Sequence, residues 1–253
     1  MPRSAMLDAL FARPPGQAVR TWLAGTRYAH RGLHDARRPE NSLAAFEAAI
    51  AAGMGIECDV QLSADRVAVV FHDLTTDRLT GSTGWVRARS AAALGAMTLR
   101  GSDQTIPTLA QALALIAGRT PLLIEIKSQG RARNKTLCRA VAGALKDYDG
   151  PVAVMSFDPR VPGWFALHAR RIPRGLVASD DSGRGGALGR RLALWRAAAQ
   201  FLAYDVRNLP SRFAARQRRR GLPVLTWTVR SAALADRAAL HADAPIAEGA
   251  GVR

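Results

Sequence analysis

Cysteine is scarce in this sequence, which has only Cys58 and Cys138 among 253 residues. Neither lies in a CxxC pair or in a Cys/His ligand spacing, so we expect neither a disulfide framework nor a zinc site. Reduced thiols are typical of proteins in the cytoplasm. The cysteine content therefore predicts a cytoplasmic location.

Long apolar runs are also missing. The first 25 residues contain no apolar core of the kind that a signal peptide needs, because residues such as Asp8, Arg13 and Pro14 interrupt it. No later segment approaches the roughly 20 apolar residues of a membrane-spanning helix. We therefore expect no membrane span, and we interpret residues 1–25 as an N-terminal extension.

Acidic residues are few beside the basic ones: 20 Asp and Glu against 36 Lys and Arg give a formal net charge of +16. Such an excess can attract nucleic acids or anionic membranes. Most of the cations are arginines spread along the chain, and the densest group, at 216 and 218–220, falls on a predicted surface helix. We therefore expect no specific nucleic-acid partner, only a positive field that attracts small anionic ligands.

Short β-branched or apolar runs alternate with longer helical patterns, which is typical of a parallel sheet with crossover helices. At 253 residues the chain has the length of an α/β barrel of eight strands, which needs roughly 250. We predict a distorted TIM (β/α)8 barrel that forms a single domain over residues 1–253. The candidate strands are 27–31, 56–62, 67–72, 121–127, 152–157, 175–179, 201–206, 224–229 and 244–247.

Helices are predicted between most of these strands, and a glycine-rich stretch at 180–189 predicts a mobile loop. Asn41 or Ser42 is expected to cap the first helix. The predicted helices span residues 42–52, 108–117, 137–148, 211–220 and 232–240.

Residues 63–66 are too few to connect parallel strands, so the strands on either side are predicted to form an antiparallel hairpin. If the turn centres between Ala64 and Asp65, Glu57 lies opposite His72 and the two side chains share a face. Asp59 shares that face because it lies two residues further along the same strand. A register shifted by one residue would turn His72 to the other face.

Charged and apolar residues alternate in the run LLIEIK at 122–127. Charges on a barrel strand are costly without partners. A divalent cation enclosed by Glu57, Asp59 and Glu125 would be such a partner. Oxygen ligands favour magnesium, calcium or manganese over zinc. The alternative is a structural salt-bridge network, for example between Glu125 and Lys127.

Five short segments combine histidine, acidic and basic residues in a fixed order: HRG at 30–32, PENS at 39–42, IECDV at 56–60, VFHD at 70–73 and IEIK at 124–127. In order and spacing, they closely resemble the signature of the glycerophosphodiester phosphodiesterase family. Further matches extend this resemblance as far as Val229, and the segment 74–105 corresponds to a short version of the family's capping insertion. The closing strand departs from the family pattern, and Glu248 either replaces a missing aspartate or marks a reshaped site.

The resemblance implies a distorted barrel that hydrolyses glycerophosphodiesters to glycerol 3-phosphate and an alcohol. It implies that His30 and His72 act as general acid and base, and that the three carboxylates hold one divalent metal ion. It also implies that Arg31 and Lys127 bind the phosphate, while Trp227 lines the substrate pocket. Attack by water and attack by the neighbouring glycerol hydroxyl both fit these residues.

Two other functions are compatible with the sequence. A lysophospholipase D would act on lipid phosphodiesters and needs an apolar groove for the acyl chain. A noncatalytic basic barrel would bind phosphate-rich polymers through its arginines. The presence of both histidines and all three acids argues against that binding protein, because binding alone does not require them.

Overall fold

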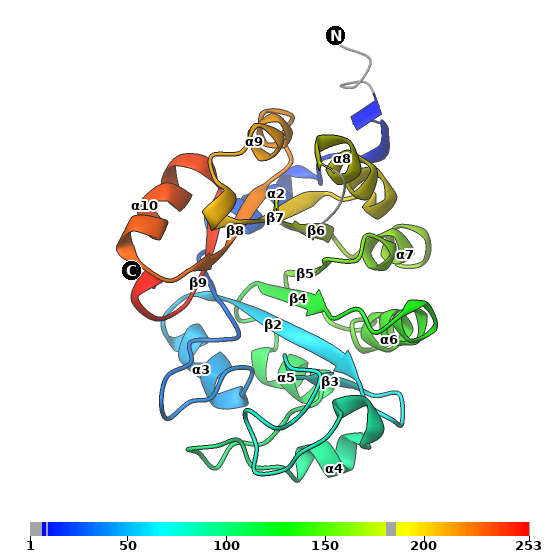
Figure 1. The fold of residues 1–253 in the computed structure, drawn as a ribbon, viewed down its shortest axis with the longest axis vertical. Helices are drawn as coiled ribbons and strands as arrows, with labels where there is room; N and C mark the ends of the chain where they lie inside the picture. Colours follow the sequence, from blue (N-terminus) through cyan, green and yellow to red (C-terminus); the bar gives the residue numbers. More distant parts are fainter. Residues whose placement is uncertain (1–6, 9, 181–185, 253) are drawn as a thin grey trace. The chain divides into compact units, whose positions relative to one another are not determined.

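The computed structural model describes the chain except for residues 1–6, 9, 181–185 and 253 (Figure 1). Its described residues form two compact units, one from Met1–Tyr28 together with Val152–Arg253 and the other from Ala29–Pro151. The single domain over residues 1–253, with its extension at 1–25 and its capping insertion at 74–105, stays a prediction. No helix in the described part of the chain is long and apolar enough to cross a membrane.

The unit Ala29–Pro151 is built around a central strand that is buried along its whole length. Strand β2 (Gly55–Leu62) pairs in parallel with β4 (Leu122–Ile126) and antiparallel with β3 (Ala68–Val70). β1 (Tyr28–Ala29) lies where the two units meet in the sequence. The helical segments are α3 (Leu43–Ala51), η1 (Val86–Ala88), α4 (Ala91–Gly95), α5 (Leu109–Ile116) and α6 (Arg131–Ala144).

The predicted hairpin is confirmed, but its predicted register is wrong by one residue. Val60 pairs with Val70, so the position opposite Glu57 is residue 73 and not His72. The reason is a loop of three residues, closed by three hydrogen bonds of 2.9 to 3.0 Å between Ser63 and Val67, instead of a two-residue turn. Arg66 takes a left-handed φ of 67° there, as three-residue hairpin loops require. β3 ends at Val70, so His72 lies beyond the strand.

The other unit contains five parallel strands in sequential order, each followed by a helical segment. Its core consists of alanine, leucine and valine side chains from these strands and helices. The strands are β5 (Val152–Ser156), β6 (Arg174–Ala178), β7 (Phe201–Asp205), β8 (Val224–Val229) and β9 (Ala244–Ala247). The helical segments are α2 (Gln17–Gly25), α7 (Arg160–His168), α8 (Gly186–Ala197), η2 (Val206–Asn208), α9 (Arg212–Arg219), α10 (Ala232–His241) and η3 (Gly249–Gly251).

Each of the nine candidate strands is present, and helix punctuation explains most helix boundaries. Ser42, and not Asn41, caps α3, because its hydroxyl accepts from the backbone N–H of Ala45 at 3.1 Å. Thr108 forms a capping box with Gln111 at the start of α5. Helix α6 begins six residues before its predicted start. Of the predicted loop at 180–189, residues 181–185 lie outside the described residues, whereas 186–189 begin helix α8.

Gly175 on β6 provides a test of the packing in the unit that contains strands β5 to β9. A Cβ at this position would lie 2.3 Å from the ring of Phe201, so Gly175→Ala should lower the free energy of unfolding by about 1–3 kcal/mol. Gly143→Ala is the matched control, because nothing lies within 4 Å of its added Cβ and helix α6 favours alanine. Urea denaturation of both variants measures the difference. Equal stability of the two variants would contradict the packing described here.

Candidate functional site

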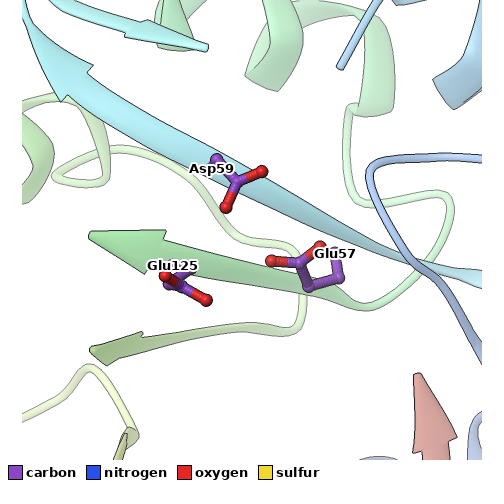
Figure 2. A group of neighbouring side chains, drawn as sticks. All are labelled: Glu57, Asp59 and Glu125. Carbon is purple, nitrogen blue, oxygen red and sulfur yellow. The ribbon is translucent and has the colours of Figure 1, made fainter. Parts of the chain in front are cut away.

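Three buried carboxyl groups gather on neighbouring strands of the unit Ala29–Pro151. The parallel register of β2 and β4 pairs Asp59 with Glu125, and Glu57 lies two residues earlier on the same face of β2. One oxygen from each group lies within 4.8 Å of the other two. Figure 2 shows Glu57 and Asp59 on β2 and Glu125 on β4. The predicted metal-ligating residues are thus brought together.

A lysine two residues past Glu125 joins this cluster. The Nζ of Lys127 lies 2.8 Å from Asp59 Oδ1 and 2.6 Å from Glu125 Oε1. Burial alone would lower the pKa of Lys127, but Asp59 and Glu125 hold it above its usual value. The lysine therefore stays charged and neutralises part of the cluster. This is the ion pair that the sequence offered as an alternative to a metal cage.

Arg31 approaches the same carboxylates from the loop after β1. Its backbone takes a left-handed φ of 57°, and its N–H donates to Glu57 Oε2 at 3.1 Å. Its guanidinium lies 3.1 Å from Asp59 Oδ2 and 2.7 Å from Glu40 Oε1. Both predicted phosphate-binding cations therefore contact the acidic cluster directly.

Burial and like charges separate the protonation of the two β2 carboxyl groups. Burial raises the pKa of Glu57 well above its usual value, and the charges of Asp59 and Glu125 raise it further. Burial would also raise the pKa of Asp59, but Lys127 and Arg31 hold it well below its usual range. Asp59 is therefore the member of the pair that ionises readily, whereas ionisation of Glu57 is disfavoured.

The two predicted catalytic histidines lie in the same unit as the carboxylates. His30 is buried, and its Nε2 lies 4.0 Å from Glu57 Oε2. His72 is partly exposed beyond the end of β3, and its Nδ1 lies 2.7 Å from Asp73 Oδ1. His72 is close enough to influence the cluster, because a positive charge on its ring would lower the pKa of Asp59.

Sequence reasoning missed the residue that holds His72 in place. Gln61 is fully buried on β2, and its Nε2 donates to the backbone carbonyls of Phe71 and Asp73 at 2.9 and 2.6 Å. These bonds fix the peptide segment on both sides of His72. The sequence does contain a signal for Gln61, because this residue continues the alternation of polar residues on one strand face that starts with Glu57 and Asp59.

Two further missed residues lie in the PENS segment. Asn41 is buried with a left-handed φ of 60°; its Nδ2 donates to Asp59 Oδ2 at 2.9 Å and its Oδ1 accepts from the backbone N–H of Asp59 at 3.1 Å. Glu40 accepts hydrogen bonds from Arg31 and from Arg78 of the capping segment. Asn41 therefore orients a carboxylate, and Glu40 orients a cation.

The donor set fits a hard divalent cation. Three carboxylates within 4.8 Å offer oxygen ligands alone, which suits magnesium, calcium or manganese. Only two cations, Arg31 and Lys127, contact these three carboxyl groups among the described residues, so the cluster keeps an excess of negative charge when all three are ionised. The triad is therefore able to bind a metal ion.

Two of the predicted residues lie in the other unit. The indole Nε1 of Trp227 donates to the carbonyl of Ala203 at 2.9 Å, and its ring meets that of Phe157 edge to face. Glu248 accepts from Nε of Arg230 at 2.5 Å. A role for Trp227 in the substrate pocket stays a prediction, as do the roles assigned to the other site residues.

The described residues define an α/β protein with a candidate metal centre at its strands, and solved structures agree with that class. An Oleispira antarctica phosphodiesterase in complex with the product sn-glycerol-3-phosphate superimposes with a TM-score of 0.78 at 25% identity, over 88% of this chain and 92% of that one. The fold class is that of a TIM barrel, as predicted.

The chain belongs to the glycerophosphoryl diester phosphodiesterase family, whose model matches residues 30–248. A glycerophosphodiester phosphodiesterase of Caldanaerobacter subterraneus is 39% identical over 130 residues, which are 48% of this chain and 52% of that protein. Human glycerophosphodiester phosphodiesterase 1 is 33% identical over 144 residues, 53% of this chain and 43% of that protein. These matches span about half of the length of both relatives.

The raised pKa of Glu57, caused first by burial and then by the neighbouring carboxylates, predicts that ionisation of Glu57 destabilises the metal-free protein. As the pH rises above the usual pKa of a glutamate, Glu57 loses its proton in the unfolded chain but keeps it in the folded protein. The free energy of unfolding therefore falls with rising pH until Glu57 ionises in the folded protein too. Glu57→Gln removes this loss. In the presence of a chelator at neutral pH, the variant should therefore melt at a higher temperature than the wild type.

A divalent metal ion should reverse the order of melting temperatures, so that the wild type melts above Glu57→Gln. At a concentration of about 100 times its Kd, a metal ion should stabilise the wild type by about 2.7 kcal/mol and the Glu57→Gln variant by less. The control is Glu47→Gln, which changes an exposed carboxylate paired with Arg119. Thermal melts with and without Mg²⁺, Ca²⁺ or Mn²⁺ measure both effects. A wild type that shows no stabilisation by any of the three ions would contradict the metal assignment.

Proposed function

We propose that this protein hydrolyses glycerophosphodiesters to glycerol 3-phosphate and an alcohol. The observation that carries the proposal is the buried triad of Glu57, Asp59 and Glu125 in direct contact with Arg31 and Lys127. Membership of the family and the product-bound Oleispira relative support it. The substrate is then a small phosphodiester.

The triad would hold one divalent metal, for which magnesium or calcium is proposed and manganese is also suitable. When bound, the metal would neutralise phosphate oxygens and favour the added negative charge of the transition state. Arg31 and Lys127 are proposed to orient the same phosphate, and their contacts with Asp59 support this role. Their positive charges would stabilise the phosphorane-like transition state more than the substrate, because negative charge accumulates on the phosphate oxygens in that state.

His30 and His72 are proposed as the acid and base that move protons between the nucleophile and the leaving alkoxide. Asp73 binds Nδ1 of His72, so Nε2 is the nitrogen that exchanges a proton with the substrate. Gln61 limits the movement of this histidine through its two hydrogen bonds to the flanking carbonyls. Either water or the neighbouring glycerol hydroxyl is a suitable nucleophile for this pair.

One observation favours lysophospholipase D activity as a second candidate. Leu74 and Trp85 of the capping segment are 52% and 45% exposed, and a backbone hydrogen bond from Val86 to Leu74 holds them near each other. Leu74 follows Asp73 directly, so apolar side chains lie close to His72 in the sequence. Such a pair provides a surface for an acyl chain. The buried free cysteines support a cytoplasmic location for either activity.

A metal-titrated assay of glycerophosphocholine hydrolysis tests the proposal. His30→Ala should lower kcat by about 10²- to 10⁴-fold, because general acid–base catalysis contributes that much. The matched control is His168→Ala, which removes an exposed histidine stacked on Trp164. Full activity in His30→Ala would refute the assigned mechanism. Lysophosphatidylcholine assayed in parallel separates the two candidate substrates.

A further inference from the structure

Exposed apolar side chains concentrate in one part of the unit that contains α8. Five large hydrophobic side chains are between 40% and 65% exposed on residues 7–11 and on α8. The two segments are joined, because the rings of Phe11 and Trp195 lie 5.7 Å apart and Trp195 Nε1 donates to Asp8 at 2.9 Å. We call this surface the leucine face; it comprises Leu7, Leu10, Phe11, Leu188 and Leu192.

A cavity of about 640 Å³ adjoins the leucine face and is lined by four arginines. Leu188 belongs to both, because it also lines the cavity. We call this feature the arginine cavity; its cations are Arg190, Arg191, Arg212 and Arg216, which come from α8 and α9 (Figure 1). A volume of this size accommodates a lipid head group.

Among the described residues, the carboxylates near the arginine cavity do not balance its charge. Arg191 and Arg216 share the buried carboxylate of Asp8 at 3.2 and 3.3 Å, and Arg190 pairs with Asp180 at 3.1 Å. Arg212 is exposed and has no ion pair within the described part of the chain. In that part of the chain, two carboxylates therefore face the four guanidinium groups, and positive charge is in excess.

Local polar groups in the arginine cavity also favour an anion. The Nε of Arg190 is buried without a hydrogen-bond acceptor among the described residues. Arg212 and Phe213 are the first two residues of α9 and lie at the positive end of the helix dipole. Arg190 lies beside this helix end, with its guanidinium carbon 5.8 Å from the ring centre of Phe213. A guanidinium group with an unsatisfied donor beside a helix N-terminus suits the oxygens of a phosphate.

We propose that the leucine face and the arginine cavity together bind the surface of a membrane that contains anionic phospholipid. The phosphate head group enters the arginine cavity, and the leucine face meets the boundary between head groups and acyl chains. Apolar residues beside clustered cations are characteristic of proteins that bind the membrane interface. Nucleic acid explains the leucines less well, because single strands are bound mainly by stacking on aromatic rings.

Vesicle co-sedimentation with the full chain tests this proposal. The protein should bind vesicles of phosphatidylcholine and phosphatidylglycerol but not vesicles of phosphatidylcholine alone. Arg190→Gln/Arg212→Gln should weaken binding roughly 10- to 30-fold, because each cation near an anionic leaflet adds to the affinity. Leu188→Gln/Leu192→Gln should weaken it by about tenfold through lost apolar contact. Arg212→Gln alone changes only an exposed side chain and serves if the double variant fails to fold.

Two control variants match these changes elsewhere in the chain. Arg139→Gln/Arg237→Gln removes the same charge from exposed positions on α6 and α10, and Leu240→Gln changes a leucine that is 72% exposed. Both controls should bind vesicles as the wild type does. Hydrolysis of glycerophosphocholine by every variant should also stay at the wild-type level, which separates this proposal from the proposed catalytic function.

Four results would overturn the proposal. The first is no binding to anionic vesicles. The second is equal weakening in Arg139→Gln/Arg237→Gln, which would indicate an effect of net charge alone. The third is binding of inorganic pyrophosphate by calorimetry without binding of vesicles, which would make the cavity a site for a soluble anion. The fourth is self-association in sedimentation that the leucine variants abolish, which would assign the face to a second copy of the chain.

Discussion

Three carboxyl groups that are buried within 4.8 Å of one another repel each other and have lost most of their hydration. Much of the unit Ala29–Pro151 compensates for this arrangement. Lys127 bridges Asp59 and Glu125, and Arg31 contributes both its guanidinium group and its backbone N–H. Glu57 nevertheless keeps a raised pKa, so the side chains compensate only in part. The remaining negative charge is what makes this cluster suitable for a divalent cation.

The need to compensate the buried carboxylates also explains two unusual backbone conformations near the cluster. Arg31 and Asn41 both adopt left-handed φ values, which cost energy for residues other than glycine. In return, each of them donates a hydrogen bond to a carboxylate of the cluster. The strain therefore occurs where it orients charged groups, as expected for a functional site. Through Glu40 and Asp73, Arg78 of the capping segment extends this ionic network as far as His72.

Local patterns were sufficient to predict most of the fold and the members of the cluster. Apolar runs identified all nine strands, and the alternation of acids on one strand placed Glu57 and Asp59 on one face. The register of the hairpin was not accessible, because the three-residue loop depends on Arg66 adopting a backbone conformation that its residue type does not predict. Asn41 was considered only as a helix cap, because its contact with Asp59 joins residues 18 positions apart.

The triad is able to bind a metal ion, and we propose that this ion is the catalytic one. Anomalous diffraction from a crystal grown with Mn²⁺, recorded at the manganese absorption edge, tests it most directly. The account predicts one strong peak within coordination distance of Glu57, Asp59 and Glu125, with Lys127 moved away from at least one of them. A peak at another site, or no peak while Lys127 still bridges Asp59 and Glu125, would contradict it.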